Sequence, residues 1–317
     1  MATILFTHES CVDHDPGPMH PESPARLRAV HAALADDKYA NLERREAPIA
    51  EVEQIARIHP AAYVEKVLEA IPSEGRVMLD GDTHVSPGSG EAARRAVGAL
   101  CSAVDAVVGK ETNNAFCAVR PPGHHAEQTI PMGFCVFNSV AAGAEHARQQ
   151  HGMERAAVVD FDVHHGNGTQ AMFWADAGLF FASTHQMPLY PGTGSASETG
   201  EYGNIVNAPL APFSGSEEFR DAMSDRVLPA LRSFEPDIIF ISAGFDAHNQ
   251  DPLAQMNLTT GCYEWMTQRM LEVADQYAEG RLISMLEGGY DLNALSECVR
   301  VHVDTLMHGT ASSLRQS

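Results

Sequence analysis

The chain has 317 residues, of which 44% are hydrophobic and 20% are charged, a composition typical of a globular protein and unlike that of a disordered one. Its formal net charge of −21 argues against a nucleic-acid binder, which needs basic side chains to neutralise phosphates. The sequence has no apolar run near the roughly 18 residues of a membrane span, and its first residues lack the basic n-region of a signal peptide. We therefore expect a cytoplasmic protein that binds neither nucleic acid nor a membrane.

Short apolar runs alternate with longer segments of helical period, and no repeat or linker interrupts them, which predicts one domain over residues 1–317. Strands are predicted over Ile4–Thr7, Ala115–Val119, Ala156–Phe161, Leu179–Thr184, Ile238–Ser242 and Leu282–Leu286. Helices are predicted over Pro24–Ala35, Ala61–Ala70, Gly90–Val108, Asn138–His151, Glu217–Ser233, Tyr263–Ala278 and Asp291–His308. Continuous β-branched runs such as AAVVDF and DIIFIS indicate an α/β fold with a mostly parallel sheet covered on both faces.

Five of the predicted strands end at segments rich in reactive side chains. These segments are, in chain order, RPPGHHAE, DFDVHHGNG, the strand end at His185, AGFDAH and EGGYD. In an open parallel sheet the ligand binds at the carboxyl ends of the strands, which all lie at one edge. The sequence therefore predicts that these five segments form one site.

The segment DFDVHHGNG has the alternation expected of metal ligands. In an extended chain Asp160, Asp162 and His164 point to the same face. Asp162 and His164 offer oxygen and nitrogen donors, and Asp246 from a neighbouring strand end completes a set of three, which leaves a position open for water as in catalytic zinc sites. The alternative interpretation, that the aspartates only shape a turn, does not account for the other reactive strand ends. Ferrous iron accepts the same ligand set, so the choice between Zn²⁺ and Fe²⁺ stays open.

His124 and His125 are neighbours in the chain, and we expect their side chains to diverge on a loop rather than to share one ion. Two imidazoles beside a metal site suit proton transfer, in which one removes a proton from the attacking water and the other stabilises charge. Asp160 and Asn167 are the predicted hydrogen-bond acceptors that fix the two tautomers.

Tyr290 follows two glycines, Gly288 and Gly289, which allow the backbone to bend sharply. We expect the phenol to reach into the cleft and to donate a hydrogen bond to a developing oxyanion.

The motifs RPPGHHAE, GFCVFN, VVDFDVHHGNG, ISAGFDAH and LEGGY, in this order, resemble those of the zinc-dependent histone deacetylase family. The resemblance lies on the class II side, with bacterial deacetylase-like amidohydrolases and acetylpolyamine amidohydrolases. HPESPARL (His20–Leu27) resembles the N-terminal loop of that group. The implied fold is the arginase/deacetylase fold, in which helices flank an eight-stranded, mainly parallel sheet on both faces.

The resemblance also implies the metal ligands. It implies that Asp162, His164 and Asp246 bind zinc. It further implies a structural potassium ion, held largely through backbone oxygens by Asp160, Asp162, His164, Ser183 and Thr184.

The catalytic roles implied by the resemblance agree with the chemistry of the residues. His125 matches the general base and acid, and His124 matches its electrostatic partner. Asp160 and Asn167 match the residues that pair with these imidazoles, although Asn167 stands where class I enzymes have Asp. Tyr290 matches the residue that polarises the scissile carbonyl.

The resemblance implies a tunnel for an acylated side chain. Phe134 and Tyr190 match its two aromatic walls, although the second is more often Phe, and Gly133 would present its backbone to the substrate amide. From the N-terminal loop, His20 and Pro21 are also predicted to bind substrate.

Two substrate classes remain open: acetylated lysine in a peptide or protein, and a small N-acyl amine such as an acetylpolyamine. Polyamine-selective relatives carry a Glu where this chain has Leu253, which offers no counter-charge and favours lysine. Asp80 and Asp82 on the rim keep the second class open, because either carboxylate could hold an ammonium group or a peptide backbone. The sequence leaves homo-oligomer formation open.

Two other classes fit less well. A ureohydrolase with two manganese ions needs Asp-x-Asp where this chain has Asp246-Ala247-His248, and Asn167 removes another bridging acid. A non-catalytic sensor of acylated ligands would be expected to lose a zinc ligand or the tyrosine, and this chain has them all.

Overall fold

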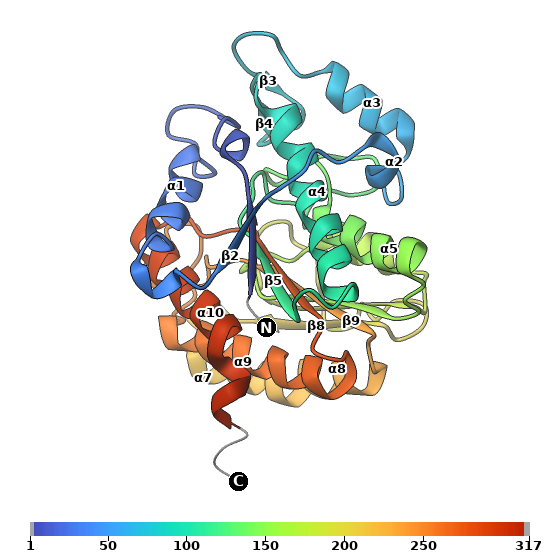
Figure 1. Ribbon diagram of the computed structural model, residues 1–317, viewed down its shortest axis with the longest axis vertical. Coiled ribbons are helices and arrows are strands. Elements are labelled where there is room, and N and C mark those ends of the chain that lie inside the picture. Colours follow the sequence, from blue (N-terminus) through green and yellow to red (C-terminus); the bar gives the residue numbers. More distant parts are fainter. Residues whose placement is uncertain (1–2, 314–317) are drawn as a thin grey trace.

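The computed structural model describes residues 3–313, in which a parallel eight-stranded sheet carries helices on both faces (Figure 1). The strand order across the sheet is β2 (Glu43–Glu46), β1 (Ile4–Thr7), β5 (Asn114–Cys117), β10 (Leu282–Leu286), β9 (Ile238–Ala243), β6 (Ala156–Asp160), β7 (Leu179–Gln186) and β8 (Ile205–Leu210). This arrangement confirms the predicted fold class. Of the predicted domain, residues 1–2 and 314–317 lie outside the described part.

Helices cover both faces of the sheet. One face is covered by α4 (Ser89–Val108), α5 (Ser139–His151) and α6 (Asn167–Phe173). The other is covered by α1 (Pro24–Ala33), α7 (Ser216–Ala222), α8 (Leu228–Phe234), α9 (Thr260–Tyr277) and α10 (Leu292–Ser313). No helix within residues 3–313 combines the length and the apolarity needed to cross a membrane.

A smaller region precedes α4 and extends beyond the sheet edge that carries the site (Figure 1). It contains the short helices α2 (Val52–Ile55) and α3 (Ala61–Glu69) and an antiparallel hairpin of β3 (Val77–Met78) and β4 (His84–Val85). A second hydrophobic cluster, which includes Tyr63 and Val64 of α3, Val97 of α4 and Phe137, anchors this region to the main body.

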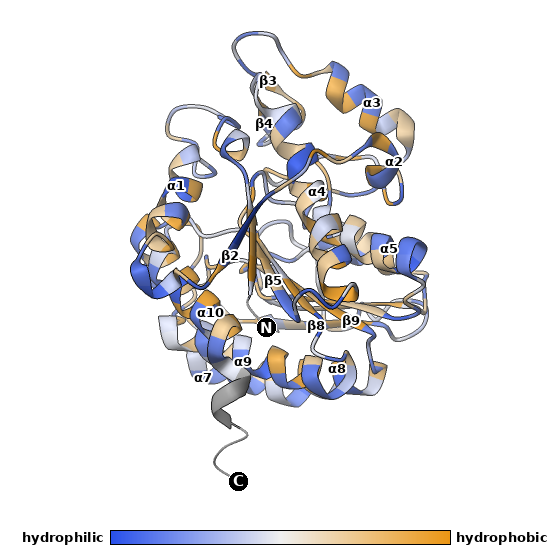
Figure 2. Cartoon of the chain, viewed as in Figure 1, coloured by the Kyte–Doolittle hydropathy of each residue, from blue (hydrophilic) through white to orange (hydrophobic). Residues whose placement is uncertain are grey.

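The six strands predicted from apolar runs are the six inner strands of the sheet, and the two missed strands are its edges. β2 reads ERRE and is largely exposed, so that Figure 2 shows it as a hydrophilic strand beside hydrophobic neighbours. β8 contains Pro209, which donates no ladder hydrogen bond and is tolerated because β8 pairs only with β7 among the described strands. Edge strands lack the continuous apolar run because solvent contacts one side of them.

Each predicted helix is present, but one is interrupted. The segment predicted as a single helix over Glu217–Ser233 consists of α7, a π-helical turn over Met223–Val227, and α8, which has Pro229 at its start. The prediction also missed α2 and α6, which have four and seven residues and are too short to display a helical period.

Gly98 in α4 allows the helix to lie directly on a backbone carbonyl, because a Cβ at this position would lie 2.0 Å from the carbonyl oxygen of Pro48. We expect Gly98→Ala to lower the free energy of unfolding by about 1–3 kcal/mol through overpacking, although alanine is the better helix former. Gly261→Ala in α9 is the matched control, since nothing lies within 4 Å of a Cβ there, and it should stabilise the protein by about 0.4–1 kcal/mol. Urea unfolding measures both changes in the free energy of unfolding. Equal changes in the two variants would contradict the close contact between Gly98 and Pro48.

Candidate active site

Three buried side chains at the ends of β6 and β9 converge on one point. Nδ1 of His164 lies 3.2 Å from Oδ1 of Asp162 and 3.1 Å from Oδ2 of Asp246. Backbone N–H groups orient both carboxylates: Val163 donates to Asp246 at 2.9 Å, and Gly288 donates to Asp162 at 2.8 Å. The three ligand atoms lie within 4.8 Å of one another, a grouping that could hold a metal ion.

The charge balance of this group favours a cation. Burial opposes protonation of His164, but the hydrogen bonds and charges of Asp162 and Asp246 outweigh it and raise the pKa of His164 to about 10. In the absence of an ion, a proton on the imidazole therefore compensates the two buried carboxylates, and a divalent ion would replace that proton.

The turn before Tyr290 fits closely against the same group. A Cβ on Gly288 would lie 2.2 Å from Oδ2 of Asp246 and 2.5 Å from Oδ2 of Asp162, so that a side chain is excluded there. Gly289 has a φ of 120°, which L residues rarely adopt. The two glycines therefore allow the chain to pass close to Asp162 and Asp246 and to present Tyr290 to the pocket.

The loop after β5 brings the two neighbouring histidines to this site. Nδ1 of His124 donates to Oδ2 of Asp160 at 2.9 Å, and Nδ1 of His125 donates to Oδ1 of Asn167 at 2.9 Å. The amide nitrogen of Asn167 donates to Glu127 at 2.9 Å, which turns its oxygen toward His125. Nδ1 of His125 thus carries the hydrogen, and Nε2 has a free lone pair.

The expected divergence of the two histidines was wrong, because their ring centroids lie only 4.0 Å apart. The N–H groups of Gly123 and His124 both donate to the buried carboxylate of Glu287, at 2.6 and 3.3 Å, and thereby fix the backbone of the loop. His124 is also bonded to the last residue of β6 and His125 to the first residue of α6, and these bonds hold the two rings side by side.

The two imidazoles have opposite protonation states. Burial opposes charge on both, but the carboxylates of Asp160 and Asp162 raise the pKa of His124 to about 10. Burial, followed by the cationic His124 ring, holds the pKa of His125 well below its ordinary value. The pair therefore presents a cation next to a neutral imidazole that can accept a proton.

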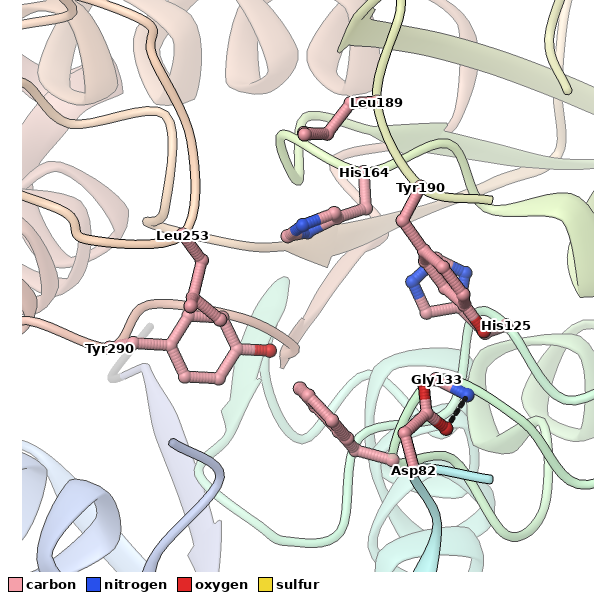
Figure 3. A pocket seen from close by; sticks show the side chains of 9 residues that line it. Asp82, His125, Gly133, His164, Leu189, Tyr190, Leu253 and Tyr290 are labelled. Carbon is pink, nitrogen blue, oxygen red and sulfur yellow. Dashed lines mark hydrogen bonds between the residues drawn. The ribbon is translucent and has the colours of Figure 1, made fainter. Parts of the chain in front are cut away.

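A pocket of about 180 Å³ opens above these groups (Figure 3). The hydroxyl of Tyr290 points into it from one side, and His125 and Tyr190 lie on the opposite side. The residues that line it are Asp82, His125, Gly133, Phe134, His164, Leu189, Tyr190, Leu253 and Tyr290. Leu189 escaped the sequence analysis, although it directly precedes Tyr190 in the segment LYPGTG.

Of the seven predicted substrate-binding residues, some line the pocket and two, His20 and Pro21, do not. Five line the pocket, namely Asp82, Gly133, Phe134, Tyr190 and Leu253. His20 packs edge-to-face on Phe134 at a centroid distance of 4.8 Å, and Pro21 is not among the lining residues.

On the rim, Asp82 accepts hydrogen bonds from the N–H of Gly133 at 3.0 Å and from the hydroxyl of Thr83 at 3.1 Å, both through Oδ1 (Figure 3 shows the first). Asp80 accepts the N–H of Asp82 at 3.2 Å in a local turn and does not line the pocket. Of the two rim carboxylates, only Asp82 therefore has a place from which it could contact a substrate.

Three histidines near the strand ends stay outside the pocket lining. His165 hydrogen-bonds to Gln170 at 3.0 Å, and His185 donates to the carbonyl of Gly194 at 3.0 Å. His248 hydrogen-bonds to Thr260 at 3.2 Å. These buried side chains are bonded within the framework, so that the five strand ends meet but do not all supply groups to the pocket.

Arg26 is a site residue that the sequence analysis missed. This buried guanidinium donates to the carbonyl oxygens of Gly289 at 2.6 Å and of Glu287 at 2.5 Å, and it lies 4.8 Å from the centre of the Tyr290 ring. The available signal was its place in the motif HPESPARL, in which only the first two residues received a role.

Glu22 of the same motif compensates the buried positive charge. It accepts hydrogen bonds from Arg26 at 3.1 Å, from Arg120 at 2.6 Å and from His14 at 3.2 Å. Burial opposes its ionisation, but Arg120 and His14 hold the pKa of Glu22 well below its ordinary value. The N-terminal motif therefore holds the backbone of the Tyr290 turn through Arg26, whose charge Glu22 compensates.

Comparison with known proteins places these features in a family. The sequence profile of the histone deacetylase domain matches residues 20–306. The histone deacetylase-like amidohydrolase of Pseudomonas aeruginosa is 37% identical over 335 residues, which cover 99% of this chain and 88% of that protein. Chloroplastic histone deacetylase 14 of Arabidopsis thaliana is 37% identical over 318 residues, which cover 94% of this chain and 75% of that protein. The crystal structure of the HDA15 HD domain superposes with a TM-score of 0.91 at 32% identity, covering 98% of this chain and 91% of that one.

The close approach of Gly288 to both carboxylates yields a prediction. If Asp162 and Asp246 hold the zinc ion expected from the sequence, Gly288→Ala should lower zinc affinity at least tenfold, because the new methyl group would displace both carboxylates. Titration with a chelating zinc indicator measures the affinity, and Gly261→Ala is the control for a methyl group added far from the site. Unchanged zinc affinity in Gly288→Ala would contradict the expectation that these carboxylates are ligands.

Proposed function

The chain belongs to the histone deacetylase family and is a hydrolase with deacetylase activity, and on that premise we propose that it removes acetyl or other short acyl groups from the ε-amino group of lysine. One observation carries this proposal: a neutral His125 and the hydroxyl of Tyr290 lie on opposite sides of a pocket that His164 also lines. The pocket walls formed by Phe134 and Tyr190 suit an unbranched aliphatic chain.

We propose that Asp162, His164 and Asp246 hold a zinc ion. Two carboxylates and one imidazole form a donor set suited to this ion, and three protein ligands are typical of catalytic zinc sites. The raised pKa of His164 supports the fit, since it reflects uncompensated negative charge. Ferrous iron accepts the same donors. When bound, such an ion supplies Lewis acidity that polarises an amide carbonyl and lowers the pKa of water.

The protein's own groups supply the proton transfers. Nε2 of His125 accepts a proton from the attacking water, because the lowered pKa leaves the imidazole neutral and Asn167 holds the hydrogen on the other nitrogen, so that Nε2 keeps a free lone pair. The hydroxyl of Tyr290 donates a hydrogen bond to the substrate oxygen as negative charge develops there. His124, charged and paired with Asp160, stabilises that charge, and a histidine protonates the departing amine. The products are a short carboxylic acid and a free amine.

We further propose that Asp160, Asp162, His164, Ser183 and Thr184 hold a structural potassium ion, largely through backbone oxygens. The buried hydroxyl of Thr184 has no hydrogen-bond partner within residues 3–313, and this unpaired oxygen supports a nearby cation.

The pocket wall supports lysine over a polyamine as the substrate. Leu253 lines the pocket and offers no charge to a distant ammonium group. Asp82 is the remaining candidate for that role, and its oxygen Oδ1 already accepts two hydrogen bonds. An acetylpolyamine or another small N-acyl amine is the second candidate substrate, for which Asp82 would provide the counter-charge.

The first test compares kcat/KM of the zinc-loaded protein on an acetyl-lysine peptide and on an N-acetylated polyamine. We expect a preference for the peptide of at least tenfold. Leu253→Glu should shift the ratio toward the polyamine by introducing a counter-charge, and Asp246→Ala, which removes a ligand, should lose activity on both. A polyamine preference in the unmodified protein would contradict the lysine assignment.

The second test removes the proposed oxyanion donor. Tyr290→Phe should lower kcat by about 10²–10³-fold, the typical cost of one such donor, while elemental analysis still finds bound zinc. Full activity in this variant would exclude the role of Tyr290.

A further inference from the structure

Asp251 is a buried carboxylate that neither binds the proposed metal nor lines the pocket. It lies in the loop after β9, five residues beyond Asp246, and its side chain accepts three backbone hydrogen bonds. Oδ2 accepts the N–H of Tyr290 at 2.6 Å and that of Asp291 at 3.2 Å, and Oδ1 accepts the N–H of Leu253 at 3.0 Å. One carboxylate thus connects the proposed catalytic tyrosine to a wall of the pocket.

The turn that carries Tyr290 depends on such bonds, because it belongs to neither β10 nor α10. Its backbone is anchored at each residue: Gly288 donates to Asp162, the carbonyl of Gly289 accepts from Arg26, and the N–H of Tyr290 donates to Asp251. The phenol extends from this turn into the pocket (Figure 3), so that a change in backbone orientation moves the hydroxyl.

Aspartate at position 251 matches the N–H donors that surround it. The turn offers two N–H donors on one side of the side chain, and the Leu253 loop offers another N–H on the opposite side. Aspartate supplies an acceptor oxygen on both sides, whereas asparagine would place an NH₂ group against one set of donors. Burial and the nearby Asp246 raise the pKa of Asp251 to about 7, which shows that ionising this carboxyl group in place is costly. A neutral asparagine would avoid that cost.

We infer that Asp251 is a positioning residue for deacylation, which holds the Tyr290 turn and the Leu253 wall of the pocket as one unit. The hydroxyl of Tyr290 then reaches the substrate oxygen only while the loop that forms the pocket wall is in place. This inference rests on the proposed role of Tyr290. It does not depend on which acyl amine is the natural substrate.

A double-mutant cycle tests the inference. Asp251→Ala and Asp251→Asn are each made in the unmodified and in the Tyr290→Phe protein, and kcat, KM and zinc content are measured at pH 8, where the carboxylate is charged. Asp251→Ala should lower kcat about tenfold to a hundredfold with a smaller change in KM, because a displacement near 1 Å costs about that much. The kcat of Asp251→Asn should lie between those of the unmodified protein and Asp251→Ala, since asparagine keeps one acceptor oxygen.

In the Tyr290→Phe background the same substitutions should lower kcat less than about threefold, because the hydroxyl that Asp251 positions is already absent. Equal losses in both backgrounds, or an unchanged kcat in Asp251→Ala, would overturn the inference. If Asp251→Ala does not fold, the asparagine variant completes the cycle under the same criterion. Full activity of Tyr290→Phe alone would instead overturn the proposed role of the tyrosine.

Asp291→Ala is the matched control, since it removes the neighbouring carboxylate without touching the Tyr290 N–H. Oδ1 of Asp291 accepts the N–H groups of Asn293 at 3.0 Å and Ala294 at 2.8 Å and thereby caps α10. This variant should lower the Tm while kcat stays within about twofold, which separates the positioning of Tyr290 from the stability of the helix that follows it. A loss of kcat equal to that of Asp251→Ala would contradict the inference.

Discussion

Three carboxylates buried at one edge of the sheet, Asp160, Asp162 and Asp246, are the constraint on which the rest of the site depends. Burying an unpaired charge is costly, so each must find a cation or several N–H donors. His124 and His164 provide imidazoles, and backbone N–H groups provide further hydrogen bonds. The charge that remains would favour a divalent ion. It also keeps His124 protonated, whereas burial and the charge of His124 keep the neighbouring His125 neutral.

A second layer of buried charge supports the first. Arg26 holds two carbonyls of the Tyr290 turn, Glu22 compensates Arg26 and Arg120, and Glu287 holds the backbone of the histidine loop. These groups act mainly on backbone atoms, so they set the positions from which the side chains of the pocket extend. Preorganisation of this kind is what lets a donor meet charge as it develops, without a cost of rearrangement during the reaction.

The errors of the sequence analysis have identifiable causes. The missed strands β2 and β8 are edges, one carrying four charged residues and the other a proline, so neither displays an apolar run. The expected divergence of His124 and His125 considered only local chain geometry, whereas Glu287, far away in the sequence, fixes their loop. Buried charges at Arg26 and Asp251 escaped notice because a polar residue in a loop motif carries no sign of its burial.

The sequence by itself determined the α/β class, the six inner strands and the reactive residues at their ends, because apolar runs and strand-end motifs are local patterns. It also carried the motifs that indicate the histone deacetylase family. Only the tertiary structure decided which of those residues face the pocket and which, like His165 and His185, are bonded within the framework. The physical reason is that these outcomes depend on hydrogen bonds and charges between segments far apart in the chain, such as Asp251 with Tyr290.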